Sequence, residues 1–209
     1  MKEKFIRKFM RLAKQIGEDE NPCYSRQIGV IIVDPASKAI RSTGYNGPPP
    51  NTPHTDSPAY LREFFWPQLY QDEIEIINNK LKHPHEPSDF TQARNESILE
   101  DFLVQFSNKQ ICPRRLVDAK SGERSELCSC GHAERHAITN AECCIRGFVM
   151  FCWCVIPCIQ CSDAIIHAGI STVHCLLGKP YHTVSRWLLE SGGVEIVRHH
   201  EDEFEISDS

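Results

Sequence analysis

The last third of the chain alternates between helical and strand-like segments, and this alternation restricts the fold more than any other feature. A helical pattern precedes an apolar strand-like run three times: helix 132–145 before strand 148–155, helix 158–168 before strand 172–177, and helix 182–191 before strand 194–198. Strands that alternate with helices join through right-handed crossovers and form a mostly parallel sheet covered by helices. The fold class is therefore predicted to be α/β.

The N-terminal part adds a helix and a hairpin. The run at 28–34 is apolar and rich in β-branched residues, which indicates a buried strand, and 39–46 follows a turn as its return strand. Spacings of four, three and four residues place a set of apolar side chains on one face of a helix: Phe5, Phe9, Leu12 and Ile16.

The middle of the chain has a different character. Several prolines at 47–58 are incompatible with regular structure, because proline lacks the backbone donor that helices and strands need. Helical patterns follow at 59–82 and 88–108. We expect a single domain over 1–209 that carries a mainly helical insertion at about 48–127.

The composition argues against several classes of protein. With 23 Lys+Arg and 28 Asp+Glu the net charge is -5, whereas proteins held on nucleic acid or anionic membranes by bulk charge usually have a basic face. Apolar runs are shorter than the roughly 18 residues of a membrane span, and the charged N-terminus lacks an apolar signal-peptide core. We expect a cytoplasmic protein that binds neither nucleic acid nor membrane.

Cysteine is unusually frequent, with 11 residues among 209. An odd count in a chain of this length, without a secretion signal, favours metal ligands or a reactive thiol over a disulfide framework. Cys152, Cys154 and Cys175 lie in strand-like apolar runs, where we expect them to pack as small hydrophobic side chains.

Two short motifs contain the residues of a metal site. The sequence HAE begins at His132 and opens one predicted helix, and PCIQC, with Cys158 and Cys161, opens the next. A catalytic zinc takes three protein ligands and leaves a fourth position for water, and one imidazole with two thiolates meets that count. At a helix N-terminus, exposed amides and the helix dipole favour the thiolate form. Glu134 is close enough to His132 to exchange a proton with that water without binding the metal.

Each motif alone has another explanation. A CxxC pair is common in redox sites and structural zinc sites, and a zinc-binding interaction module without catalysis would also use these cysteines. Such a module gives Glu134 no role. Together, H-x-E and P-C-x-x-C form a signature of zinc-dependent nucleobase deaminases.

The sequence resembles the deoxycytidylate (dCMP) deaminase family of the cytidine deaminase superfamily. The resemblance covers 1–47 and 128–198, and its segments are SRQIGVIIVDP at 25–35, STGYNGPP at 42–49, CGHAERHAI at 130–138, IPCIQCSDAIIHAGI at 156–170 and YHTVSRWLLESGGVEI at 181–196. It implies a three-layer α/β/α sandwich with a mixed five-stranded sheet and helices on both faces. It also implies zinc on His132, Cys158 and Cys161, with Glu134 as the proton shuttle.

The resemblance further implies hydrolysis of dCMP to dUMP and ammonia, which supplies thymidylate synthesis. Members are usually homo-hexamers, and many are activated by dCTP and inhibited by dTTP. The segment GYNG, residues 44–47, favours this family over relatives that act on tRNA adenosine, free cytidine or a pterin-like ring. The negative charge also argues against tRNA, which is bound largely through its phosphates. Another cytosine nucleotide, such as dCTP or a modified one, stays open as the substrate.

Further residues are candidates for contacts with nucleotides. Asn46 resembles the asparagine that hydrogen-bonds the sugar 3′-hydroxyl, although Asn-Gly is also a common turn pair. Arg26 is a candidate for the phosphate, because a guanidinium matches phosphate geometry bidentately, or else an exposed charge at a strand edge. Tyr181 lies where the family carries an aromatic residue and is a candidate for the phosphate end. The expected allosteric nucleotide loop consists of Gly44, Tyr45, Asn46 and Gly47.

The chain departs from the family pattern in two places. His136 stands where the family usually has asparagine, which bears on how this helix packs near the base pocket. A long insertion also separates GYNG from His132, and no motif in it discloses a function.

A second, structural zinc site is also predicted. Cys23 resembles a cysteine that joins a second zinc in some family members, and the other candidates lie together in an irregular segment at 109–131. Four thiolates make a closed tetrahedral site. The candidate ligands are Cys23, Cys112, Cys128 and Cys130, with His83 and His85 as alternatives. The alternative to a metal is that these are free thiols in a loop.

Overall fold

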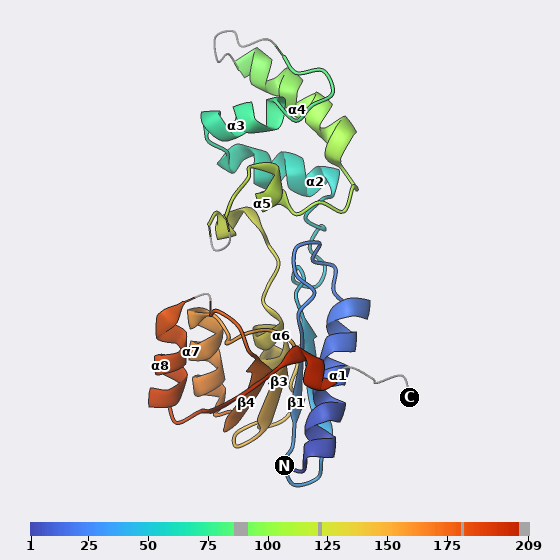
Figure 1. Ribbon diagram of the computed structural model, residues 1–209. Coiled ribbons are helices and arrows are strands. Elements are labelled where there is room, and N and C mark those ends of the chain that lie inside the picture. The colour runs from blue at the N-terminus through green and yellow to red at the C-terminus, as the bar shows by residue number, and fades with distance from the viewer. Residues whose placement is uncertain (86–91, 121–122, 181, 205–209) are drawn as a thin grey trace. The chain divides into compact units, whose positions relative to one another are not determined.

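The computed structural model describes residues 1–85, 92–120, 123–180 and 182–204 (Figure 1). The chain divides into two compact units. The first unit combines Met1–Gly47 with Gly131–Ser209, and the second is Pro48–Cys130. Among the residues described, none of the helices combines the length and the apolar character needed to cross a bilayer.

The first unit is built on a mixed five-stranded sheet with the order β2-β1-β3-β4-β5. Strand β1 is antiparallel to both of its neighbours, whereas β3, β4 and β5 are mutually parallel. The strands are β1 Gly29–Val33, β2 Ile40–Tyr45, β3 Val149–Cys152, β4 Thr172–Leu176 and β5 Glu195–His199. The predicted α/β class and the mixed sheet are confirmed, with parallel pairing restricted to the half of the sheet whose strands alternate with helices.

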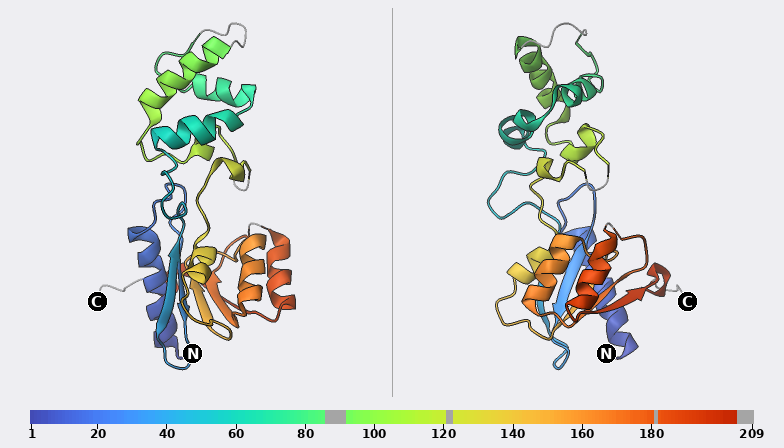
Figure 2. Two further views of the ribbon diagram at one scale, coloured as in Figure 1. Left: turned by 180° about the vertical axis from the view of Figure 1, so that it is seen from behind. Right: turned by 90° about the vertical axis from the view of Figure 1, so that its left-hand side faces the viewer.

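Helices cover both faces of this sheet (Figure 2). Helix α1, Glu3–Asp19, buries Phe9 and Met10 on one face against Ile31 and Phe151. Three helices pack on the other face: α6 Ala133–Thr139, α7 Ile159–Ala168 and α8 Thr183–Ser191. Every residue of β1 is buried, because neighbouring residues of a strand point to opposite faces and both faces are covered.

Two elements are shorter than their sequence patterns predict. Helix α6 ends at Thr139 rather than at 145, and the side chain of Asn140 donates a hydrogen bond to the carbonyl of Thr43 at 3.3 Å. Strand β3 ends at Cys152 rather than at 155, because the chain must turn there to reach Pro157 and the start of α7. The buried Cys152 and Cys175 pack in the core as expected.

The second unit is helical and has its own core. Its elements are α2 Pro58–Tyr60, a π-helical turn Leu61–Phe65, a 3-10 turn Trp66–Gln68, α3 Gln71–Asn78, α4 Gln92–Phe106, α5 Pro113–Leu116 and a 3-10 turn Ser125–Leu127. Phe65, Ile77 and Phe102 are fully buried at its centre. The single helical pattern at 59–82 is broken at Trp66–Gln68, where Pro67 supplies no backbone donor.

Candidate active site

The three predicted zinc ligands come together at the N-termini of α6 and α7. His132 is the N-cap residue of α6, Cys158 is the N-cap residue of α7, and Cys161 lies in the first turn of α7. The Nδ1 atom of His132 is 3.3 Å from the Sγ atom of Cys158 and 3.3 Å from that of Cys161. The crossover from β3 into α7 therefore places the CxxC pair against the start of the neighbouring helix.

These distances fit a zinc ion. Zn–S and Zn–N bonds of about 2.3 and 2.0–2.1 Å at tetrahedral angles put nitrogen and sulfur about 3.5 Å apart. In the part of the chain that the structure describes, His132, Cys158 and Cys161 are the one set of three such residues whose ligand atoms all lie within 4.8 Å of one another. Cys161 is buried, but Cys158 is partly exposed and His132 is exposed. Three donors on an open side are typical of a catalytic zinc rather than a closed structural one.

The two cysteines share hydrogen bonds that favour one thiolate. A hydrogen bond from the thiol of Cys161 lowers the pKa of Cys158 to about 4. The same interaction, with burial, raises the pKa of Cys161. The hydrogen bond to Cys158 raises the pKa of His132. Cys158 is thus present as the thiolate, the form in which cysteine binds metals.

Glu134 lies beside these ligands inside the protein. It is in the first turn of α6 and only 3% exposed. Burial raises the pKa of its carboxyl group. The nearby His132 and a hydrogen bond from the thiol of Cys161 lower this pKa, but they offset only part of the effect of burial. A buried carboxyl group next to an open metal position has the placement of a general acid–base group.

The end of β2 lies directly on the start of α6. The Oδ1 atom of Asn46 accepts a hydrogen bond from the backbone N–H of Ala133 at 2.9 Å. A Cβ atom on Gly44 would lie 2.2 Å from the carbonyl oxygen of Ala133, so this close approach needs glycine. Gly47 and Gly131 exchange backbone hydrogen bonds of 2.7 and 3.3 Å. The structure therefore places Asn46 beside the start of α6, next to His132, and its contact with a nucleotide sugar stays a prediction.

Two residues close to this site were not assigned to it from the sequence. Cys154 packs against the core of the first unit, as expected, and its thiol also responds to the site: a hydrogen bond with Cys152 lowers its pKa, but burial and the charges of Glu134 and Cys158 raise it overall. The sequence signal for this proximity to the site is that Cys154 lies three residues before Pro157, where the PCIQC motif begins. His136 was noted only as a departure from the family pattern, and its Nδ1 atom lies 2.8 Å from the carbonyl oxygen of Tyr45.

The other two nucleotide-binding candidates are Arg26 and Tyr181. Arg26 is exposed, and its positive charge acts to lower the pKa of Cys154. Its contact with a phosphate stays a prediction. Tyr181 lies outside the described residues, so its role stays a prediction.

Three of the four candidate ligands for a second zinc gather in the second unit. Hydrogen bonds from the thiols of Cys112 and Cys130 lower the pKa of Cys128 to about 3. The hydroxyl of Tyr60 accepts from the N–H of Ser129 at 3.1 Å and donates to the carbonyl of Leu127 at 3.3 Å, which holds the backbone on both sides of Cys128.

The other candidate ligands of this second site are Cys23 and the two alternative histidines. Cys23 belongs to the first unit, where its N–H donates to the Oδ1 atom of Asn21 at 2.6 Å, and its participation stays a prediction. Of the two alternatives, His83 is exposed, and the Nε2 atom of His85 is 3.0 Å from the Oδ2 atom of Asp101.

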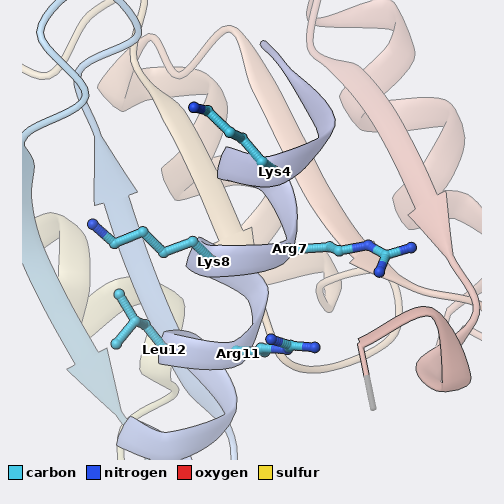
Figure 3. Close-up of a pocket in the computed structure, with 5 residues that line it drawn as sticks. All are labelled: Lys4, Arg7, Lys8, Arg11 and Leu12. Carbon is cyan, nitrogen blue, oxygen red and sulfur yellow. The ribbon is translucent and has the colours of Figure 1, made fainter. Parts of the chain in front are cut away.

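A basic pocket occurs on α1, which covers the opposite face of the sheet from α6 and α7. It is lined by Lys4, Arg7, Lys8, Arg11 and Leu12, whose side chains extend from successive turns of α1 (Figure 3). It holds none of the residues that the sequence assigns to catalysis or substrate binding.

Comparisons with known proteins identify a family and similar folds. The family model for the cytidine and deoxycytidylate deaminase zinc-binding region matches residues 3–177. Two crystal structures of dCMP deaminase from the cyanophage S-TIM5, one in apo form and one in complex with dCMP and dUMP, are similar in fold, each with a TM-score of 0.54 and 17% sequence identity. The matches cover 95% of this chain and 100% and 99% of the phage chains. None of the curated protein sequences matches the chain.

Proposed function

Because the chain belongs to the cytidine and deoxycytidylate deaminase family, whose zinc-binding region it matches over residues 3–177, we propose that it hydrolyses dCMP to dUMP and ammonia. One observation carries the reaction class: the carboxyl group of Glu134 is buried beside the cluster of His132, Cys158 and Cys161. This arrangement supplies three metal ligands and a separate proton carrier at one place. The substrate is supported by the match to the deaminase family and by the loop of Asn46 beside the ligands.

The protein residues would divide the work as follows. His132, Cys158 and Cys161 would hold zinc, which when bound supplies a Lewis acid that lowers the pKa of a water molecule towards neutrality. Glu134 takes a proton from this water and delivers it to N3 of the cytosine ring while the water oxygen bonds to C4. Glu134 then moves the proton of the new hydroxyl group to the amino group, the C4–N bond breaks, and ammonia and dUMP form.

Residues around the cluster of His132, Cys158 and Cys161 are proposed to bind the substrate. The Oδ1 atom of Asn46 is occupied by the N–H of Ala133, so the side chain presents the hydrogens of Nδ2 to a sugar hydroxyl. Arg26 is the candidate partner of the 5′-phosphate, because a guanidinium binds phosphate bidentately and its side chain is exposed.

Several further properties belong to the same proposal and are supported by the family resemblance alone. They are the supply of thymidylate synthesis, activation by dCTP and inhibition by dTTP through the loop Gly44–Gly47, a homo-hexameric assembly and a cytoplasmic location. The compact unit Pro48–Cys130 is proposed to be a helical insertion within one deaminase domain over 1–209, which a structural zinc on its cysteines would stabilise.

The variant Glu134→Gln tests the reaction class. Glutamine keeps the shape but removes the proton carrier, and such groups contribute roughly 10²–10⁴-fold, so turnover of dCMP should fall by at least that factor. Bound zinc, measured by metal analysis, should be unchanged. Glu142→Gln is the matched control, because Glu142 is an exposed carboxylate shortly after α6. Retention of more than about a tenth of the wild-type rate would refute the assigned role.

A substrate panel tests the specificity. Ammonia release should be fastest with dCMP and much slower with dCTP, deoxycytidine and 5-modified deoxycytidylates. A higher kcat/KM for one of these would move the assignment to that nucleotide. Zinc binding without ammonia release from any of them would favour a non-catalytic zinc module.

A further inference from the structure

The side chain of His136 connects the loop of Asn46 to the helix that carries the catalytic residues. Its Nδ1 atom is 2.8 Å from the carbonyl oxygen of Tyr45, and since a carbonyl oxygen only accepts, Nδ1 carries the hydrogen. In the opposite direction, the N–H of Ala133 donates to the Oδ1 atom of Asn46 at 2.9 Å. Two adjacent residues of the loop are thus bonded to α6, one through its backbone and one through its side chain.

The imidazole ring also fills the space over Gly131. A Cβ atom at Gly131 would lie 2.4 Å from Nε2 of His136 and 3.0 Å from its Cδ2, closer than a real Cβ atom approaches its neighbours. Gly131 in turn exchanges backbone hydrogen bonds with Gly47. The ring is therefore held between the carbonyl of Tyr45 and the backbone of Gly131, the residue next to the ligand His132.

We propose that His136 is a positioning residue that sets the orientation of Asn46 towards the nucleotide sugar. This rests on the proposed deaminase function. The direction of the Asn46 amide depends on the backbone at Tyr45 and Asn46, which His136 holds in place. Because this hydrogen bond touches neither Glu134 nor the metal ligands, its loss should weaken nucleotide binding more than it slows the chemical step.

The variants His136→Asn and His136→Leu separate the hydrogen bond from the packing. Asparagine places its Nδ2 donor the same number of bonds from Cα as Nδ1 of histidine, whereas leucine has the same branching without a donor. For His136→Leu we expect KM for dCMP to rise about five- to tenfold, the magnitude of one net hydrogen bond, with kcat within about twofold. His136→Asn should keep KM within about twofold of the wild type. Equal KM values for the two variants, or a loss confined to kcat, would overturn the proposal.

Gly131→Ala provides an independent route to the same hydrogen bond. The added methyl group must displace the imidazole, so KM should rise as in His136→Leu. In the double variant Gly131→Ala/His136→Asn the nearest ring atom, Nε2, and Cε1 are gone, and only the amide oxygen stands where Cδ2 was, so KM should return towards the wild-type value. A double variant no better than Gly131→Ala alone would contradict the proposed role.

Amide hydrogen exchange distinguishes a failure of this proposal from a failure of the proposed function. The N–H of Gly47 donates to the carbonyl of Gly131 and the N–H of Gly131 to the carbonyl of Gly47, so their exchange without substrate reports whether the loop stays beside the start of α6. Exchange should be faster in His136→Leu and near the wild-type rate in His136→Asn. Unchanged exchange in His136→Leu would refute the positioning role, whatever the activity. A wild-type protein that does not deaminate dCMP but shows the expected exchange pattern would reject the dCMP assignment and keep the contact.

Discussion

The stability of the first unit should fall in mild acid because two buried histidines face each other across β4 and β5. The Nδ1 atom of His174 is 2.9 Å from the Nε2 atom of His199, and the residues are 5% and 8% exposed. The ring of Phe151 stacks on His174 at a centroid distance of 4.7 Å. One hydrogen serves this contact, and protonation of both rings would place two cations side by side.

Burial, the charge of His199 and the N-terminal ammonium together lower the pKa of His174 to about 4. Other charged groups at this cluster are Glu203, whose Oε2 atom is 3.5 Å from the Nδ1 atom of His199, and Arg11, which donates to the carbonyl of Phe204 at 2.8 Å. The carboxylate of Glu203 faces His199 rather than His174, so it does not offset the burial of His174.

The sign of the effect follows from proton binding. In the unfolded chain His174 has a pKa of about 6.5, so between pH 6.5 and 4 the unfolded state binds more protons than the folded state. The free energy of unfolding therefore decreases as the pH falls through this range. With the folded value at about 4, the loss is about 2 kcal/mol at pH 5 and approaches about 3.4 kcal/mol at lower pH.

The contribution of His174 to the pH dependence of the free energy of unfolding can be measured by urea unfolding at pH 7.5 and pH 5.0, with the wild type compared with His174→Phe. Phenylalanine keeps a ring beside Phe151 but binds no proton, so the decrease between the two pH values should be about 2 kcal/mol smaller in the variant. His167→Gln is the control, because the His167 side chain is 77% exposed on α7 and should leave the pH dependence unchanged. A His174→Phe variant with the wild-type pH dependence would refute the reasoning.

Three further outcomes are expected. Cys158→Ser should remove about one zinc equivalent and abolish deamination, since oxygen replaces thiolate poorly at such a site, and metal analysis with an activity assay checks this. Cys112→Ser should lower the melting temperature and bound zinc by one of two equivalents while the site of His132 keeps its metal; a single zinc in freshly purified wild-type protein would reject the second site. Gly44→Ala should lower the free energy of unfolding by about 1–3 kcal/mol in urea, because its methyl group overlaps the backbone of α6.

The cluster of His132, Cys158 and Cys161 could be predicted from the sequence because its determinants are local. His132 and Glu134 are two residues apart, and Cys158 and Cys161 are three apart, so each pair shares the first turn of one helix. The strands were predictable for a related reason. A strand covered on both faces has no polar face, so its sequence is continuously apolar, as in the run at 28–34.

The limits of elements were harder to predict, because tertiary contacts set them. The pattern at 132–145 favours a helix throughout, but α6 ends where Asn140 meets Thr43, 97 residues earlier in the chain. The aromatic-rich pattern at 59–82 likewise does not show that Pro67 divides it into short helical turns around a separate core.

By itself, the sequence determined the α/β class and which residues are candidates for the three metal ligands and the proton carrier, because residue type and short spacing define them. Only the tertiary structure decided what surrounds them. His136 meets the carbonyl of Tyr45 across 91 residues, and His174 meets His199 across 25. Such contacts depend on which strand lies beside which helix. The periodicity of a segment indicates which of its faces is buried, but it does not identify the residues that pack against that face.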